Sequence, residues 1–338
     1  MQLPPVTIVM PAYNTAKYIG EAIESILNQT FRDFEFLIID DCSTDNTLEI
    51  ARHFTDKRIR VIRNSRNLGL PACENIGLHE VKGKYYARMD SDDISSPDRI
   101  EKLFHYLEAH PQTDVCGSAL KLFGDKEVIA SYLQDHEQIA AELIWTCSMP
   151  HAACMMRMEK IRLHDLSYDE SYSVGEDWIF LMKAKDHLRF SNLKDVLYLY
   201  RRGPQSMVSQ ASAEIWKHNS RVYRALFSDM GLDCSDEELK LHAFLLGKFD
   251  ILGPSAEVIK QARAWIVKLV AANESAKKYG AEAFARQCEL RWQQLFYNLV
   301  PTGHRNVMTY FNVSGKTAPS QFSYYAKHSF NKLIGRNT

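Results

Sequence analysis

Three aspartates lie within four residues at the end of one predicted strand. Asp90, Asp92 and Asp93 directly follow the apolar run 85–89. Carboxylates this close repel one another, but two of them at i and i+2, where a chain leaves a sheet, can both reach one hard cation. Mg²⁺ and Mn²⁺ take oxygen ligands of this kind, often together with substrate phosphates. The alternative is a solvated acidic turn in which Asp92 or Asp93 caps the next helix, and an isolated motif of this length favours that alternative.

Polar residues also follow two strands predicted earlier in the chain. Asp40 and Asp41 close the apolar run that begins at residue 34, and Pro11, Tyr13 and Asn14 follow the run 6–10. The segment NLGLPACENIG, over 67–77, contributes glycines, which let a backbone approach a ligand closely. Ligands of parallel sheets bind beyond the carboxyl ends of the strands, so these clusters are expected to meet on one rim.

Short apolar runs alternate with amphipathic helical patterns from residue 6 to about residue 200, and these elements must position the clusters. Strands are predicted over 6–10, 34–40, 58–63 and 85–89. Helices are predicted over 18–29, after a cap at Ser43 or Thr44, from Pro71, and after Ser96 and Pro97. This alternation predicts an α/β fold with a parallel, doubly wound sheet.

Strand patterns stop after about residue 207, and four segments then read as helices: 213–230, 236–249, 256–272 and 281–300. The expected organisation is therefore a catalytic domain over 1–206 and a helical region over 207–338. The helical region is expected to serve acceptor binding, membrane association or oligomerisation.

The composition is that of a soluble globular protein: 338 residues, 46% hydrophobic and 25% charged, with a formal net charge of −1. Such a balance supplies no field that recruits nucleic acid. Seven scattered cysteines without a CxxC pair suit reduced thiols rather than a disulfide framework or a zinc site. The first residues do not resemble a signal peptide, and no run is apolar enough for a membrane span. A cytoplasmic protein is expected.

The last fifty residues have an unusual charge pattern. No acidic residue follows Glu289, whereas six basic residues do, interleaved with aromatic ones. The basic residues are Arg291, Arg305, Lys316, Lys327, Lys332 and Arg336. Basic residues mixed with aromatics suit an anionic membrane surface, here the inner leaflet. An ordinary solvated tail accounts for the same composition equally well.

The motifs PAYN, SILNQT, IIDDCSTDNT, NLGLPACENIG, YYARMDSDD, PHAACMMR and GEDW occur in this order, and together they resemble the inverting family 2 glycosyltransferases. The resemblance covers residues 5 to about 205. It implies the GT-A fold, a Rossmann-like and mostly parallel sheet flanked by helices. Within the family the chain looks most similar to bacterial enzymes that extend lipooligosaccharide, O-antigen or capsule glycans, including β-1,3-N-acetylglucosaminyltransferases.

The resemblance also implies roles for particular residues. Asp90 and Asp92 match the metal-binding DxD motif for Mn²⁺ or Mg²⁺, and Asp177 matches the catalytic base, with Glu176 beside it. Asp41 would accept a hydrogen bond from the uracil of a UDP-sugar. The other nucleotide-sugar residues would be Pro11, Tyr13, Asn14, Asn67, Gly69, Arg88, Asp90 and Ser91. Donor- or acceptor-side positions would be His151, Trp178 and Arg201.

The chemistry agrees with these roles. Departure of a nucleoside diphosphate leaves negative charge, which a metal ion stabilises as a Lewis acid. Inversion requires an acceptor hydroxyl to attack from the opposite face, and one carboxylate there suffices as general base. An exposed aspartate, with an ordinary pKa near 4, is ionised at neutral pH.

A purely structural role also fits four of these side chains. Glu176 and Asp177 suit an ordinary helix start, where negative charge is favourable. A histidine such as His151 is about as often packed and hydrogen-bonded as functional. Trp178, just after a helix start, is equally consistent with a place in the core.

The chain departs from the family at one position. Many relatives carry a histidine after the last strand that acts as a further metal or diphosphate ligand, whereas this chain has Gly203 there. Arg201 or Arg202 would neutralise the diphosphate instead, since guanidinium pairs well with phosphate oxygens. Weaker metal dependence is expected as a result.

Other classes of protein fit less well. A nucleotidyltransferase would usually show a glycine-rich, basic segment near the first strand, where this chain offers only Lys17. A dinucleotide oxidoreductase needs a GxGxxG turn, which is absent. A catalytically inactive or non-UDP sugar-nucleotide-binding protein of the same fold is the remaining alternative. The expected function is transfer of GlcNAc, Gal or GalNAc from a UDP-sugar to an oligosaccharide or glycolipid acceptor.

Overall fold

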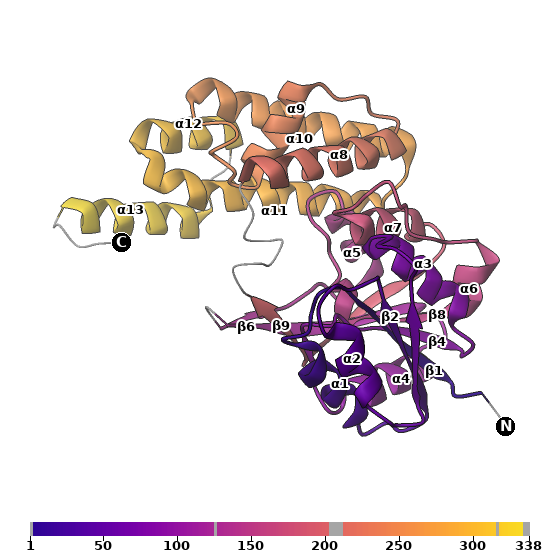
Figure 1. Cartoon of the computed structure of the whole chain (residues 1–338). Helices are drawn as coiled ribbons and strands as arrows, with labels where there is room; N and C mark the ends of the chain where they lie inside the picture. Colours follow the sequence, from indigo (N-terminus) through magenta and orange to yellow (C-terminus); the bar gives the residue numbers. More distant parts are fainter. Residues whose placement is uncertain (1–2, 125–126, 203–211, 316–317, 334–338) are drawn as a thin grey trace. The chain divides into compact units, whose positions relative to one another are not determined.

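The computed structural model describes residues 3–124, 127–202, 212–315 and 318–333. The chain divides into two compact units, Met1–Gln210 and Ala211–Thr338 (Figure 1). The domain boundary expected between residues 206 and 207 lies outside the described residues, as does Gly203. Each unit is described below by itself.

One nine-stranded sheet organises the first unit, in the order β3-β2-β1-β4-β8-β6-β9-β5, with β7 paired to β6. The strands are β1 (Val6–Ala12), β2 (Phe34–Asp40), β3 (Ile59–Arg63), β4 (Tyr85–Arg88), β5 (Ile94–Ser95), β6 (Val115–Gly124), β7 (Val128–Ala130), β8 (Met155–Arg157) and β9 (Phe190–Arg202). The four strands predicted from the sequence are β1 to β4, and they form one half of the sheet.

The two halves of the sheet differ in strand direction. The pairs β1–β2, β1–β4 and β2–β3 are parallel, as predicted. Beyond β4, β8 pairs antiparallel with both β4 and β6, and β5 pairs antiparallel with β9, whereas β6 and β9 are parallel. The α/β class is therefore confirmed, with a parallel half and a mixed half. Strands of two or three residues such as β5 and β8 carry too few side chains to show a periodic pattern.

Helices cover both faces of the sheet (Figure 1). In the first unit they are α1 (Ile19–Leu27), α2 (Thr47–His53), α3 (Leu70–Glu80), α4 (Arg99–Ala109), α5 (His136–Glu142), α6 (Met158–Leu163) and α7 (Glu176–Ala184), with a 3₁₀ turn over His151–Ala153. Alternate residues of β1 and β2 pack with α1 and α4 in one core on one face. On the other face α3 lies against β1, and Gly77 allows this close approach.

The predicted cap of α2 is wrong. The residue before that helix is Asn46, and neither Ser43 nor Thr44 caps it. Instead the Ser43 hydroxyl accepts a hydrogen bond from the Asn14 backbone N–H at 3.1 Å, and Thr44 donates its own N–H to the Asn14 side chain at 2.8 Å. These contacts join the ends of β1 and β2, so they stabilise the rim of the sheet rather than a helix end.

The second unit consists of helices in its described residues: α8 (Ser212–Asp229), α9 (Asp236–Leu245), α10 (Ala256–Ala276), α11 (Ala281–Leu299), α12 (His304–Ser314) and α13 (Pro319–Leu333). The sequence predicts the first four, and α12 and α13 lie in the basic aromatic tail. None of the helices described here has the length and apolar character to cross a membrane.

Candidate active site

The acidic triplet follows β4 and separates into two environments. The Asp90 side chain is 24% exposed, and its Oδ1 lies 3.0 Å from Nη2 of Arg88. Asp93 is buried and accepts a hydrogen bond from the Arg201 N–H at 2.7 Å, which ties the turn to β9. The strand β5 follows the triplet and α4 begins only after Asp98, so the alternative of a helix-capping turn is wrong.

Burial and mutual repulsion disturb these carboxylates. The pKa of Asp92 is raised to about 6, first by burial and then by the charge of Asp90. The pKa of Asp93 is raised by burial and by both neighbouring aspartates. A divalent cation would relieve this repulsion, so Asp90 and Asp92 fit a hard-metal site. Among the described residues no group of three or more acidic, histidine or cysteine side chains forms a complete metal cage. Water and substrate oxygens are the usual further ligands of such a cation.

Arg88 is the centre of a buried polar network beside the triplet. Its Nε lies 2.6 Å from Glu74 Oε1 on α3, and Nη1 donates to His151 Nδ1 at 2.6 Å. The carboxyl group of Glu74 also accepts a hydrogen bond from the Tyr86 hydroxyl. Arg88 and Glu74 are 4% and 0% exposed, so each compensates a charge that would otherwise be buried alone.

His151 continues this network. The ring is 3% exposed, and its Nε2 lies 2.7 Å from the hydroxyl of Tyr168. Burial, and then the charge of Arg88, lower the pKa of His151 well below its ordinary value. Both ring nitrogens therefore have protein partners, as expected of a packed histidine, and the ring faces the interior rather than a ligand.

The base expected from the sequence lies in the first turn of α7. Asp177 Oδ1 accepts a hydrogen bond from the Trp178 N–H at 2.7 Å, and its Oδ2 lies 3.6 Å from the Cys147 sulfur. Beside it Glu176 is buried, and burial followed by the charge of Asp177 raises the pKa of Glu176. The Trp178 ring is 6% exposed and donates from Nε1 to the Leu143 carbonyl at 2.7 Å, so this side chain is packed in the core.

Asp41 organises the loop between β3 and α3. Its Oδ1 accepts hydrogen bonds from the Asn64 side chain at 2.8 Å and the Leu68 N–H at 2.9 Å, and its Oδ2 accepts one from the Gly69 N–H at 2.8 Å. Gly69 has φ of +90°, a conformation that favours glycine, and it directly precedes α3. The Cys73 thiol is a further hydrogen-bond partner of this buried carboxylate.

The remaining nucleotide-side residues lie at different depths. Pro11 is buried in β1, paired with Ile39 of β2, and Ser91 is also buried. The Tyr13 ring is 47% exposed at the end of β1 and is free to cover a flat ligand. The Asn14 side chain is instead engaged with Thr44.

Arg201 lies next to the triplet and already has partners. Its Nε donates to the Asp92 carbonyl at 2.7 Å and its Nη2 lies 2.5 Å from Glu21 Oε2. The guanidinium also lies over the rings of Tyr18 and Phe123, at 4.7 and 4.6 Å. Any pairing of Arg201 with phosphate oxygens would therefore compete with Glu21.

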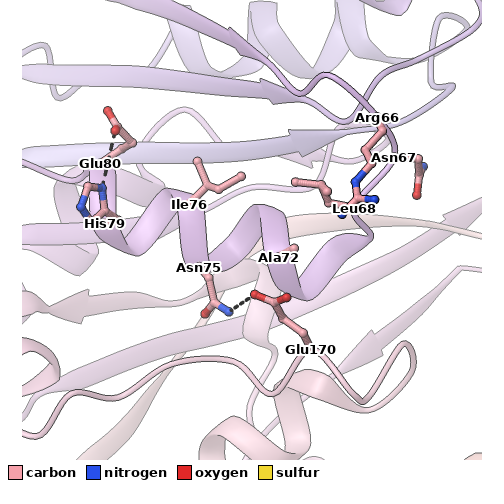
Figure 2. A pocket seen from close by; sticks show the side chains of 9 residues that line it. All are labelled: Arg66, Asn67, Leu68, Ala72, Asn75, Ile76, His79, Glu80 and Glu170. Carbon is pink, nitrogen blue, oxygen red and sulfur yellow. Dashed lines mark hydrogen bonds and ion pairs between the residues drawn. The ribbon is translucent and has the colours of Figure 1, made fainter.

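A cavity of about 570 Å³ lies on the outer face of α3 (Figure 2). Its lining residues are Arg66, Asn67, Leu68, Ala72, Asn75, Ile76, His79, Glu80 and Glu170. Asn67 is the only site residue expected from the sequence that lines it, and neither the acidic triplet nor Asp177 contributes to it. The cavity is therefore separate from the carboxylates that could perform catalysis.

Sequence reasoning misses four members of the site: Asn64, Glu74, Tyr86 and Tyr168. One signal is present, because Arg88 interrupts a strand that is otherwise apolar, and a buried arginine requires a buried acid. Glu74, on α3, is that acid. Tyr168 gives no such signal, since tyrosine is common in ordinary cores.

An α/β sheet with two carboxylates at the end of β4 and a third at the start of α7 is the arrangement expected of a glycosyltransferase that uses nucleotide sugars. The glycosyl transferase family 2 model matches residues 7–164. An uncharacterized glycosyltransferase of Methanocaldococcus jannaschii is 33% identical over 222 residues, which cover 60% of this chain and 72% of that protein. The chain belongs to glycosyltransferase family 2.

Other relatives agree with this assignment. An uncharacterized glycosyltransferase of Haemophilus influenzae is 35% identical over 211 residues, 59% of this chain and 65% of that protein, so the match spans just under two thirds of its length. The solved structure of S. aureus TarS 1–349 in complex with UDP-GlcNAc has a TM-score of 0.59 at 20% identity and covers 86% of this chain and 91% of its own. The mannosyltransferase PcManGT from Pyrobaculum calidifontis, in complex with GDP-Man and Mn²⁺, has a TM-score of 0.51 at 16% identity, covering 99% and 89%. These two structures share the GT-A-like fold.

Proposed function

We propose that the protein transfers a sugar from a UDP-sugar to a hydroxyl of a cell-surface glycan with inversion at the anomeric carbon. One observation carries the proposal. Asp90 and Asp92 follow β4 in an environment that suits a divalent cation, and Asp177 lies in the first turn of α7 and is only partly buried. Asp90 and Asp92 would hold the metal ion at the diphosphate of the donor, and Asp177 would face the acceptor hydroxyl.

Different residues of the chain would bind the metal ion and accept the proton. Asp90 and Asp92 would hold Mn²⁺ or Mg²⁺, which when bound supplies Lewis-acid stabilisation of the departing diphosphate. Asp177 takes the proton of the acceptor hydroxyl, and its position is fixed by the Trp178 N–H. The raised pKa of Glu176 favours its neutral form, so Asp177 is the carboxylate of this pair that acts as base.

Nucleotide recognition is assigned to the end of β1 and the loop held by Asp41. The exposed Tyr13 ring would cover the base, and Asp41 would accept a hydrogen bond from the uracil imide. The UDP-GlcNAc complex of TarS supports a UDP-sugar, with GlcNAc, Gal or GalNAc as the sugar. The GDP-Man complex of PcManGT makes a non-UDP donor the second candidate.

The proposal also includes the acceptor and the location of the protein in the cell. A relative named as a succinoglycan biosynthesis protein, from Rhizobium meliloti, is 29% identical over 199 residues, which supports an oligosaccharide or glycolipid acceptor. The basic aromatic tail would hold the protein at the inner face of the cytoplasmic membrane. The second unit would also supply any interface between copies of the chain.

A nucleotide-release assay tests the proposal. The protein is incubated with a panel of UDP-, GDP- and dTDP-sugars, with and without Mn²⁺, and the released nucleoside diphosphate is measured. Slow hydrolysis of one UDP-sugar, faster with Mn²⁺, is the expected result. Turnover of a GDP- or dTDP-sugar would replace the donor in the proposal. Calorimetry that detects no binding of UDP, GDP or dTDP would overturn the nucleotide-sugar mechanism as a whole.

A further inference from the structure

The orientation of Asp90 depends on three buried side chains that contact one another in a row: Arg88, His151 and Tyr168. The last two lie far from the acidic triplet in sequence. The Arg88 guanidinium lies among three partners: Nη1 donates to His151, while Nε and Nη2 lie at ion-pair distance from Glu74 and Asp90, at 2.6 and 3.0 Å. A guanidinium is planar, so three partners in three directions fix both its position and its rotation. Fixing the guanidinium also restrains Oδ1 of Asp90, which lies 3.0 Å from Nη2.

The donor and acceptor of the next two hydrogen bonds, Arg88–His151 and His151–Tyr168, follow from the chemistry of the side chains. Arginine can only donate, so Nδ1 of His151 must accept from Arg88, and a neutral ring then carries its proton on Nε2. That proton faces the Tyr168 oxygen at 2.7 Å. His151 therefore acts as a spacer of fixed length between Tyr168 and Arg88.

Tyr168 is itself held on two sides. The Asn75 side chain on α3 accepts from the Tyr168 N–H at 2.8 Å and donates to its carbonyl at 3.0 Å. The Tyr168 ring stacks on Phe180 of α7, with centroids 4.4 Å apart and planes at 17°. Asp177 lies in the first turn of α7. Tyr168 therefore contacts both the helix that carries the expected base and His151, which hydrogen-bonds to Arg88 beside Asp90.

We propose that His151 and Tyr168 are positioning residues for sugar transfer. They hold Arg88, and through it Asp90, in the orientation in which the Asp90 carboxylate meets the metal and diphosphate of the donor. The inference rests on the proposed function, since it assigns Asp90 to the donor. Packing alone does not require the Tyr168 hydroxyl, because a phenylalanine would fill the same volume without burying a polar atom. His151 also supplies the acceptor for the buried Nη1 of Arg88.

Three variants test the inference. Tyr168→Phe removes one hydroxyl and keeps the stack on Phe180. His151→Asn keeps an acceptor near the Nδ1 position for Arg88 but loses the link to Tyr168, and His151→Leu loses both. The matched control is Tyr106→Phe, which removes a hydroxyl hydrogen-bonded to Ser191 at 2.9 Å, outside the site. The measurements are Tm, binding of UDP with Mn²⁺ by calorimetry, and hydrolysis of the sugar nucleotide that the wild-type protein turns over.

For Tyr168→Phe the expected result is a loss of function without a matching loss of stability, whereas His151→Leu should also lower Tm because it leaves a buried N–H of Arg88 without an acceptor. Tyr168→Phe and His151→Leu should lower kcat about tenfold, the effect of one lost buried hydrogen bond, and weaken Mn²⁺ binding in the presence of UDP severalfold. The kcat of His151→Asn should lie between those of wild type and His151→Leu. Tyr168→Phe should lower Tm no more than Tyr106→Phe does.

Two results would overturn the inference. One is that Tyr168→Phe and His151→Leu keep the kcat and Mn²⁺ affinity of the Tyr106→Phe control. The other is that Tm falls in both while kcat and Mn²⁺ affinity of the folded protein stay unchanged, which would leave a structural role only. Failure of the proposed function is distinguishable, since the wild-type protein itself would then bind no UDP and hydrolyse no sugar nucleotide.

Discussion

At the scale of single residues, Asp41 joins the end of β2 to the loop before α3. Three donors converge on its two oxygens: the Asn64 side chain and the N–H groups of Leu68 and Gly69. The Asp41 carboxylate therefore stabilises this loop even without a bound nucleotide. It is buried, and each hydrogen bond to a charged group contributes about 1.5–3 kcal/mol.

The variant Asp41→Asn tests this structural role. An amide has one oxygen, so its NH₂ group would face either the Gly69 N–H or the other two donors. We expect a loss of about 1–3 kcal/mol in the free energy of unfolding, together with weaker UDP binding. Denaturant titration and calorimetry measure the two effects. Asp33→Asn, at an exposed position before β2, is the control, and equal stability of the two variants would contradict this account of Asp41.

Sequence reasoning identifies charged residues of the site better than their partners. Asp90, Asp92 and Asp177 are proposed from the ordered set of motifs that resembles the family, because each short motif taken alone also fits an ordinary structural role. The sequence leaves the role of His151 undecided, since a lone histidine has the same sequence pattern whether it binds a ligand or is packed between Arg88 and Tyr168. That decision needs the contact between β4 and the loop before α7, which no local pattern contains.

At the scale of elements, the contact between α3 and β1 sets the distance between the nucleotide-side loop and the sheet. A side chain at Gly77 would place its Cβ 2.7 Å from Val9 Cγ1 and 3.5 Å from the Tyr86 ring. Glycine is therefore required there by space, although it disfavours a helix interior. The helix carries Glu74, so any shift of α3 would also move the partner of Arg88.

The variant Gly77→Ala should lower stability by about 1–3 kcal/mol, because overpacking outweighs the gain in helix propensity. Gly20→Ala in α1 is a matched control, since the nearest atom to its new Cβ is Ile50 Cγ2 at an ordinary 3.8 Å. That control should be neutral or more stable by up to about 1 kcal/mol. Thermal unfolding of both variants measures the difference, and two shifts of the same sign would refute the packing argument.

Strong periodicity and long runs determine which elements the sequence predicts. The strands β1 to β4 and helix α1 carry four or more residues of regular pattern, and their predicted bounds agree with the structure within a few residues. The strands β5 and β8 have two and three residues, and their place in the sheet depends on pairing with β9, β4 and β6. Long-range pairing of this kind leaves no local signal, which is why the sequence does not predict β5 and β8. The longer strands β6 and β9, of 10 and 13 residues, are missed for another reason: β9 contains the polar segment 192–195, and its pairing with β6 has register shifts.

At the scale of the whole molecule, charge is distributed unevenly along a chain whose net charge is −1. Exposed aromatic rings occur in the same region as the basic residues: Phe322 is 63% exposed and Tyr324 is 44% exposed, both on α13. Arg305 on α12 and Lys327 on α13 are also exposed. A surface of this composition is attracted to anionic lipid headgroups, at about 1 kcal/mol for each cation near the bilayer.

Binding to lipid vesicles tests this attraction. We expect the protein to sediment with vesicles of phosphatidylcholine and phosphatidylserine but not with phosphatidylcholine alone, and to be released as salt rises. The double variant Arg305→Glu with Lys327→Glu should bind at least tenfold more weakly. Lys57→Glu with Lys82→Glu, at exposed positions in the first unit, is the control with the same change in net charge. An equal loss in both pairs would show that only net charge matters and would contradict a role for the tail.

The central claim, that Asp177 is the general base of a sugar transfer, is tested most directly by comparing Asp177→Asn with wild type in turnover and in nucleotide binding. The account predicts unchanged UDP affinity by calorimetry and a kcat lower by about 10²–10⁴-fold, the usual contribution of a general base. The control is Asp169→Asn, which changes a carboxylate paired with Lys183 near the same helix and should keep both properties. An Asp177→Asn variant that binds UDP and keeps the wild-type kcat would contradict the claim.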